Sequence, residues 1–211
     1  MSSAHPVDRF GRSLPTCDWP PDRVAPARLE MLRRFCNTTN LESGADRLGD
    51  ASDFAEWLAE QGHEPFVASP SELRRCIAVR EAFRRGAIAH RERRSDLPAM
   101  TEVRDLADDV RFVVATDDRA LRIVVDPSDA PVQRFIGSLV LAVTSDDAGS
   151  GWVRVKACRA CQWVVYDHSK NRSAQWCSMS ACGGRSKVRQ HRARRRSSAT
   201  NPAGDVEPRH D

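Results

Sequence analysis

The sequence predicts an α+β fold, mainly helical with one β-hairpin, followed by a small cysteine-rich module. Between residues 26 and 144, apolar residues recur in several segments at the spacing of one helix face. β-branched residues concentrate instead in 110–116 and 120–125, and the short connection 117–119 between them is typical of a hairpin. Four cysteines then gather within 158–182.

The first two helices are indicated by apolar spacing and by candidate capping residues. The pattern in 27–39 predicts a helix, and the polar residues Asn37 and Thr38 within it are expected to bond locally. Asp53-Phe-Ala-Glu56 has the pattern of a capping box, which predicts the start of the second helix. Gly62 is suited to the end of that helix.

The next helix has the strongest start signal in the chain. Ser69-Pro-Ser-Glu72 supplies a capping serine, a proline at the first helical position and a glutamate at the third. Its apolar stripe continues to about His90, and Cys76 on that stripe is expected to be a core residue, as is Cys36 earlier. Further helices are expected over 98–108 and 131–144.

The four cysteines in 158–182 form two close pairs, Cys158-Arg-Ala-Cys161 and Cys177-Ser-Met-Ser-Ala-Cys182, with fifteen residues between the pairs. Zinc binds four thiolates tetrahedrally at about 2.3 Å, and two close pairs on separate turns supply that geometry. We expect 163–166 and 174–177 to be paired strands that carry the second pair back to the first. Asp167 and His168 between them are expected to serve the turn rather than the metal.

Two disulfides are the alternative interpretation of these four cysteines. Residues 1–18 contain no apolar core of signal-peptide length, and Pro6 and Pro15 interrupt them, so the sequence favours a reducing, cytoplasmic location. Paired cysteines in that environment are more often metal ligands. No stretch approaches eighteen uncharged apolar residues, so no membrane contact is expected. We therefore predict a Zn²⁺ site with Cys158, Cys161, Cys177 and Cys182 as ligands.

The cysteine-rich module resembles a CGNR-type zinc finger. The resemblance covers about fifty residues and rests on the following segments: Cys158-x-x-Cys161, Tyr166-Asp-His-Ser-Lys-Asn-Arg172, Trp176-Cys-Ser-Met179 and Cys182-Gly-Gly-Arg185. It implies that the finger binds nucleic acid through the basic residues that follow. Gly184 stands where the family usually has asparagine, and it lacks the hydrogen-bonding side chain of that residue.

The N-terminal part is similar to the ABATE domain, which precedes this finger in bacterial proteins. The similarity rests on Phe35-Cys-Asn-Thr38, on Asp46-Arg-Leu48 and on Trp57-Leu58 before Gly62. Proteins of this family are regarded as stress-induced transcription regulators, so the resemblance implies that function. The expected organisation is a disordered N-terminus (1–25), an ABATE-like domain (26–150), the finger (151–196) and a disordered tail (197–211). The polar, glycine-containing segment 146–151 is the expected linker, so 26–145 are expected to fold alone.

The charge of the chain is uneven along the sequence. Residues 158–211 contain eleven Lys and Arg and four Asp and Glu, a net charge of +7, whereas residues 1–157 carry a net charge of −3. A basic C-terminal part suggests an acidic partner for that part alone. The candidate nucleic-acid-binding residues are Lys170, Arg172, Arg185, Lys187, Arg189, Arg192, Arg194, Arg195 and Arg196.

DNA is the favoured partner, because a lone helix can enter the major groove, where base edges are distinguishable. RNA is the first alternative, with Trp163, Tyr166 or Trp176 stacking on unpaired bases. A structural or protein-interaction module without nucleic acid is the second alternative. A small-molecule or protein effector of the N-terminal domain is a further candidate partner. The sequence contains no catalytic motif, and we expect no enzyme activity.

Overall fold

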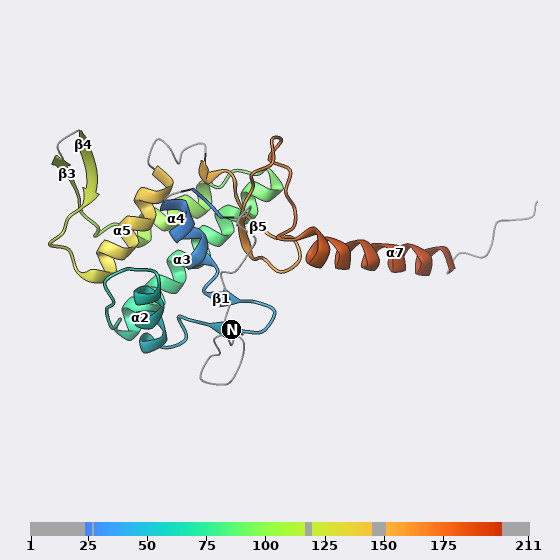
Figure 1. Cartoon of the computed structure of the whole chain (residues 1–211), viewed down its shortest axis with the longest axis horizontal. Helices are drawn as coiled ribbons and strands as arrows, with labels where there is room; N and C mark the ends of the chain where they lie inside the picture. Colours follow the sequence, from blue (N-terminus) through green and yellow to red (C-terminus); the bar gives the residue numbers. More distant parts are fainter. Residues whose placement is uncertain (1–23, 27, 117–119, 145–150, 200–211) are drawn as a thin grey trace, which may run out of the picture.

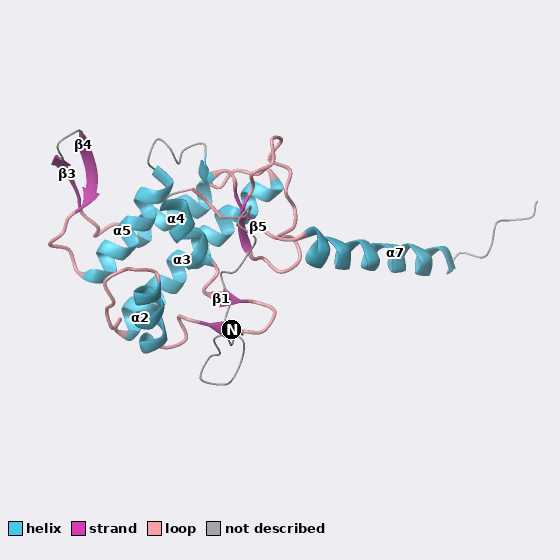
Figure 2. Cartoon of the chain, viewed as in Figure 1, coloured by secondary structure: helices cyan, strands magenta, loops and turns pink. Residues whose placement is uncertain are grey.

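The computed structural model consists of helices joined by short antiparallel hairpins, as Figure 1 and Figure 2 show. It describes residues 24–26, 28–116, 120–144 and 151–199. The predicted disordered N-terminus lies outside these ranges except for its last two residues, and the predicted linker lies outside except for Gly151. The predicted α+β class is confirmed.

The long helix α3 (Pro70–Glu92) packs against three other helices and a β-strand and is the central helix of the body. The capping box that the sequence predicted is present: Glu72 N donates to Ser69 Oγ at 3.3 Å, and Ser69 N donates to Glu72 Oε2 at 2.7 Å. At the other end, Arg93 adopts a left-handed conformation with φ 56°. Arg94 N then donates to Ala89 O at 2.9 Å, so backbone groups close the helix end.

Three helices pack beside α3 and share one apolar core. They are α1 (Arg28–Cys36), α4 (Leu97–Leu106) and α5 (Pro131–Thr144), and all three contact α3. The core extends to α2 (Ala51–Glu60), because Phe135 of α5 packs edge-on against rings of α1 and α2. Cys36 and Cys76 are buried in this core, as the sequence predicted.

Two of the hairpins belong to the helical body. β1 (Thr39–Asn40) pairs with β2 (Ala45–Asp46) directly after α1. β3 (Phe112–Thr116) pairs with β4 (Leu121–Val125), which confirms the hairpin predicted from β-branched residues. Gly137 of α5 lies under this second hairpin, where an added Cβ would stand 2.6 Å from Val125.

The third hairpin is a layer between the helical body and the cysteines. β5 (Val155–Ala157) pairs with β6 (Val164–Tyr166), and all residues of both strands are buried. Because successive strand residues point to opposite faces, the first and third residues of each strand lie in the core of the body. The opposite face carries Val165, which belongs to the apolar cluster around the cysteines.

Side chains of α3, and Asn37 just after α1, bind the backbone of this third hairpin. The amide of Asn37 donates to Val164 O and accepts from Val164 N, each at 2.8 Å. Arg84 donates to Gln162 O at 3.0 Å, and His90 Nδ1 lies 2.9 Å from a carbonyl oxygen of β5. These contacts join segments far apart in the sequence, and they hold the finger against the body.

The structure corrects the expectation for Asn37, and it also moves two helix boundaries. The side chain of Asn37 bonds to a residue 127 positions away rather than locally. The first helix ends at Cys36 rather than Thr39, and α2 begins at Ala51 because Asp50 Oδ1 accepts from Ser52 N at 2.8 Å. Asp53-Phe-Ala-Glu56 therefore lies within the helix and does not cap it.

The predicted strand pairing inside the finger is wrong. Residues 164–166 pair with 155–157, and residues 174–177 form no strand. The turn between the paired strands therefore contains Cys158 and Cys161, the first cysteine pair. The basic residues after the second cysteine pair lie on a helix that runs to Ala199, beyond the predicted end of the finger at residue 196, and the rest of the predicted tail lies outside the described residues.

None of the helices among the described residues combines the length and the apolar character that a membrane crossing requires.

Replacing Asn37 tests how strongly the body supports the finger. Asn37→Ala leaves a buried N–H and a buried C=O of Val164 without partners, so we expect a loss of about 2–4 kcal/mol in unfolding free energy. Urea denaturation of the zinc-loaded protein measures this. Asn40→Ala is the control, because the side chain of Asn40 accepts from two exposed turn amides among the described residues, and its loss should cost less than about 1 kcal/mol. Equal losses in the two variants would contradict the prediction.

Candidate metal centre

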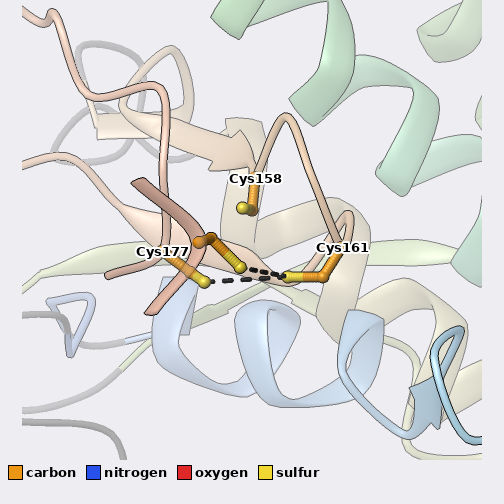
Figure 3. A group of neighbouring side chains, drawn as sticks. Cys158, Cys161 and Cys177 are labelled. Atoms are coloured by element: carbon orange, nitrogen blue, oxygen red, sulfur yellow. Dashed lines mark hydrogen bonds between the residues drawn. The ribbon is translucent and has the colours of Figure 1, made fainter. Parts of the chain in front are cut away.

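The four predicted cysteine ligands converge on one point. Their sulfur atoms all lie within 4.8 Å of one another. Cys161 Sγ lies 3.6 Å from the sulfur of Cys177 and 3.6 Å from that of Cys182. A tetrahedron with metal–sulfur bonds of about 2.3 Å has edges of about 3.8 Å, so the spacing suits a tetrahedral metal. Figure 3 shows the sulfur atoms of Cys158, Cys161 and Cys177 turned toward one another.

The first cysteine pair lies in the turn between β5 and β6. Cys158 N donates to Trp163 O at 2.9 Å, and Gln162 N donates to Cys158 O at 2.9 Å. Gln162 has a φ of 58°, a left-handed conformation that lets the chain reverse directly after Cys161. Strand pairing and turn geometry therefore position the two cysteines of this pair.

The second pair lies at the start of the C-terminal helix. A single π-helical turn, η2 (Met179–Gly183), follows Cys177, and Gly183 N donates to Ser178 O at 2.9 Å. This wide turn brings Cys182 back beside Cys177, and α7 (Gly184–Ala199) begins directly after it. Arg159 N donates to Gln175 O at 2.9 Å, which joins the segment of the second pair to that of the first.

The ionisation of the cluster requires a cation. Hydrogen bonds from Cys161 and Cys177 hold the pKa of Cys158 far below that of an ordinary thiol. The hydrogen bond to Cys158 raises the pKa of Cys161 to about 12, and hydrogen bonds to both neighbours raise the pKa of Cys177. Among these three thiols, hydrogen bonds thus favour the thiolate of Cys158. A Zn²⁺ ion binds all four thiolates and compensates two of their four negative charges, and four thiolates at this spacing fit it.

Apolar groups and one arginine surround the sulfurs. Val165, Trp163 and Trp176 pack against them and limit contact with water. Arg185 Nη2 lies 3.2 Å from Cys182 Sγ, and Arg185 Nη1 lies 3.2 Å from Glu42 Oε1 of the body. The hydrogen bond to Cys182 is the main cause of a raised Arg185 pKa. Arg185 therefore offsets part of the negative charge that four thiolates bring to one zinc ion.

The loop 167–173 is organised by Asp167 and not by the metal. Burial alone would raise the pKa of Asp167, but hydrogen bonds from Ser169, Lys156 and Ala174 outweigh it and lower the pKa to about 2. Lys156 Nζ lies 2.9 Å from Asp167 Oδ2, and both side chains are buried. His168 Nε2 lies 2.8 Å from Val24 O instead of the cysteines. The carboxylate thus serves the turn.

The predicted nucleic-acid-binding residues lie on two elements. On α7, the side chains of Arg185, Lys187, Arg189, Arg192 and Arg195 are exposed. Those of Arg194 and Arg196 lie outside the described part of the structure. Lys170 and Arg172 are exposed in the loop 167–173, and Arg172 also lines a cavity beside the end of α3. Their role in binding stays a prediction.

Two features of this centre were not predicted from the sequence. The contact of Arg185 with Cys182 could have been found, because residues three positions apart at a helix start lie on one face. The buried pair of Lys156 and Asp167 had no such signal, since Lys156 lies on β5, which the sequence did not predict as a strand.

Comparison with known protein families agrees with both parts of the structure. Residues 31–150 match the ABATE family, described as "Putative stress-induced transcription regulator". Residues 154–195 match the CGNR zinc finger. The two matches follow each other in the predicted order, so both sequence resemblances are confirmed. No curated protein matches the chain.

Removing one cysteine tests the zinc site. Cys177→Ser replaces a thiolate with a hydroxyl that zinc binds weakly, so we expect purified protein to lose its stoichiometric zinc. Elemental analysis together with a thiol titration measures this. Cys76→Ser is the control for loss of a cysteine, because Cys76 is buried in the core away from the cluster and its loss should leave zinc bound. Full zinc occupancy in Cys177→Ser would exclude Cys177 as a ligand.

Replacing Arg185 tests the charge compensation at Cys182. Arg185→Ala removes the donor to a ligand sulfur, and loss of such a partner weakens metal affinity by about tenfold or more. Competition with a chromogenic chelator measures the affinity. Lys187→Ala removes an exposed charge from the same helix and should leave zinc affinity unchanged, as the matched control. Equal affinities in the two variants would show that the sulfur contact does not stabilise the site.

Proposed function

Because the chain belongs to the ABATE family and carries a CGNR zinc finger after that domain, we propose that it is a DNA-binding transcription regulator. In this proposal, zinc fixes the base of α7, and α7 contacts the DNA. The zinc site and the membership of a regulator family do not depend on whether α7 contacts DNA.

The observation that carries the proposal is the exposure of α7. This helix extends away from the rest of the described chain (Figure 1). It has seven Lys and Arg among its 16 residues, with no acidic residue, and its single large apolar residue, Val188, is 50% exposed. Like charges at helical spacing destabilise a helix, and phosphate groups would neutralise them.

The zinc site gives α7 a fixed starting point. Cys182 lies within the π-helical turn that leads directly into α7, so a bound metal holds the first turn of the helix. The ion pair of Arg185 with Glu42 connects the same turn to the helical body. A helix anchored in this way loses less freedom when it binds a duplex than a detached basic segment would.

DNA is favoured over RNA by the burial of the aromatic residues. Tyr166 is 8% exposed and belongs to the core of the body. Trp163 and Trp176 are partly buried against the cysteines. Stacking on unpaired bases requires exposed rings, and these rings are used in packing. An isolated helix of about 24 Å fits the major groove of a duplex.

We also propose that the protein is not an enzyme and that it is located in the reducing cytoplasm. A zinc ion with four thiolate ligands has no open position for water or substrate, which supports a structural role for the metal. Four thiols within 4.8 Å of one another would oxidise readily outside a reducing compartment unless zinc protected them, which supports the proposed location.

A salt titration of DNA binding tests the proposal. The affinity of the zinc-loaded protein for a duplex should fall with salt, by about 0.9 in log affinity per unit log salt for each phosphate contact. Arg189→Ala together with Arg192→Ala should flatten this slope by roughly two units if both residues contact phosphates. Fluorescence polarisation measures it. If one of them reads a guanine edge instead, cognate DNA should weaken by about 1–3 kcal/mol, with less effect on non-specific DNA.

Arg74→Ala together with Arg104→Ala is the matched control, because both residues are exposed on the body and the net charge changes equally. This control should leave the slope unchanged. Unchanged affinity and slope in the α7 variant, with zinc still bound, would reject α7 as the DNA-binding element. A single-stranded RNA and a duplex DNA measured in parallel decide between the two nucleic acids.

A further inference from the structure

A cavity of about 390 Å³ lies where the end of α3 meets the finger. One wall belongs to the helical body and the other to the finger. The lining residues are His90, Arg93 and Arg94 at the end of α3, Val153 and Lys156 near or in β5, and Asn171 and Arg172 in the loop 167–173. Its size is within the range of small-ligand sites.

The lining of this cavity is basic and contains no carboxylate. The acidic residues nearby are already paired: Glu92 accepts from Arg94 at 2.9 Å, and Asp167 accepts from Lys156 at 2.9 Å. The side chains of Arg93 and Arg172 form no hydrogen bond or ion pair with any described residue. Two cations, one on each wall, are thus available for an anion.

The backbone of the finger wall is fixed by hydrogen bonds. Asp167 accepts from Ala174 N at 2.9 Å and from Ser169 N at 2.9 Å, and Arg172 N donates to Ser169 O at 3.2 Å. The buried ammonium of Lys156 donates to the carbonyl of Arg172. The backbone at Arg172 is therefore held in place beside the cavity, which lowers the ordering cost of binding there.

Cations at this place could instead complement the carbonyl end of α3, as basic residues at helix C-termini often do. Backbone groups already satisfy two carbonyls of that end: Arg93 N donates to His90 O at 3.2 Å, and Arg94 N donates to Ala89 O at 2.9 Å. The guanidinium of Arg172, which has no partner among the described residues, comes from the loop 167–173 and not from the end of α3. An anionic ligand in the cavity accounts for the presence of both Arg93 and Arg172 in its lining.

We propose that this cavity binds a small phosphorylated molecule, with its phosphoryl group between Arg93 and Arg172. Guanidinium groups bind phosphoryl oxygens in bidentate fashion, and a doubly charged anion matches the two free cations. The bound ligand connects α3 to the loop of the finger, so it stabilises their contact. This site is separate from α7, and it stands whether or not α7 binds DNA.

Calorimetry of the full-length, zinc-loaded protein with pyrophosphate tests the proposal at constant ionic strength. We expect saturable binding of one pyrophosphate per chain, with inorganic phosphate weaker and chloride inactive. Arg93→Gln and Arg172→Gln should each weaken pyrophosphate binding by about tenfold or more, because each removes a charged hydrogen-bond donor. Arg104→Gln removes an equal charge from an exposed site on α4 and should leave binding unchanged.

Zinc content of each variant shows that the finger is intact. Arg189→Ala with Arg192→Ala, the α7 variant, should bind pyrophosphate normally, which separates this site from the proposed DNA contact. Absence of saturable binding, or binding that Arg93→Gln and Arg172→Gln leave unchanged, would overturn the proposal. It would also be overturned if pyrophosphate does not bind while these two variants flatten the salt dependence of duplex DNA binding. That result would assign the cavity to the nucleic-acid backbone.

Discussion

The structure depends on a short hairpin that is covered on both faces. A two-stranded sheet is at best marginally stable in water by itself. Here the first and third residues of β5 and of β6 complete the core of the helical body, while Val165 on the other face packs against the cysteines. Helices α1 and α3 supply the first cover, and the metal centre supplies the second. The fold of the body and the geometry of the zinc ligands are therefore linked through these few residues.

Arginine has different roles in different parts of the molecule. Arg80 and Arg84 of α3 are buried, and both have partners: Arg80 binds Asp46 at 2.6 Å, and Arg84 binds Gln162 O at 3.0 Å. Such pairs are costly to break, so they favour one arrangement of the helices. The guanidinium groups of Arg189 and Arg192 face solvent. Burial thus separates the arginines that hold the fold from those available to a partner.

The sequence was sufficient where the signal is local. Ser69 and Glu72 cap α3 as predicted, because a capping box requires only four consecutive residues. The four cysteine ligands also followed from spacing. The partner of β6 did not, since the three residues of β5 are too few to show a period. Asn37 was assigned a local bond because its true partner, Val164, lies 127 positions away, and only packing brings them together.

The two-sided hairpin also has a consequence for how this finger could be transferred between proteins. Insertion of one residue into β5 would exchange its two faces, and would direct core side chains toward the metal. A finger grafted onto another scaffold would expose the apolar face that α1 and α3 now cover. The hairpin and the helices that cover it must therefore be transferred as one unit.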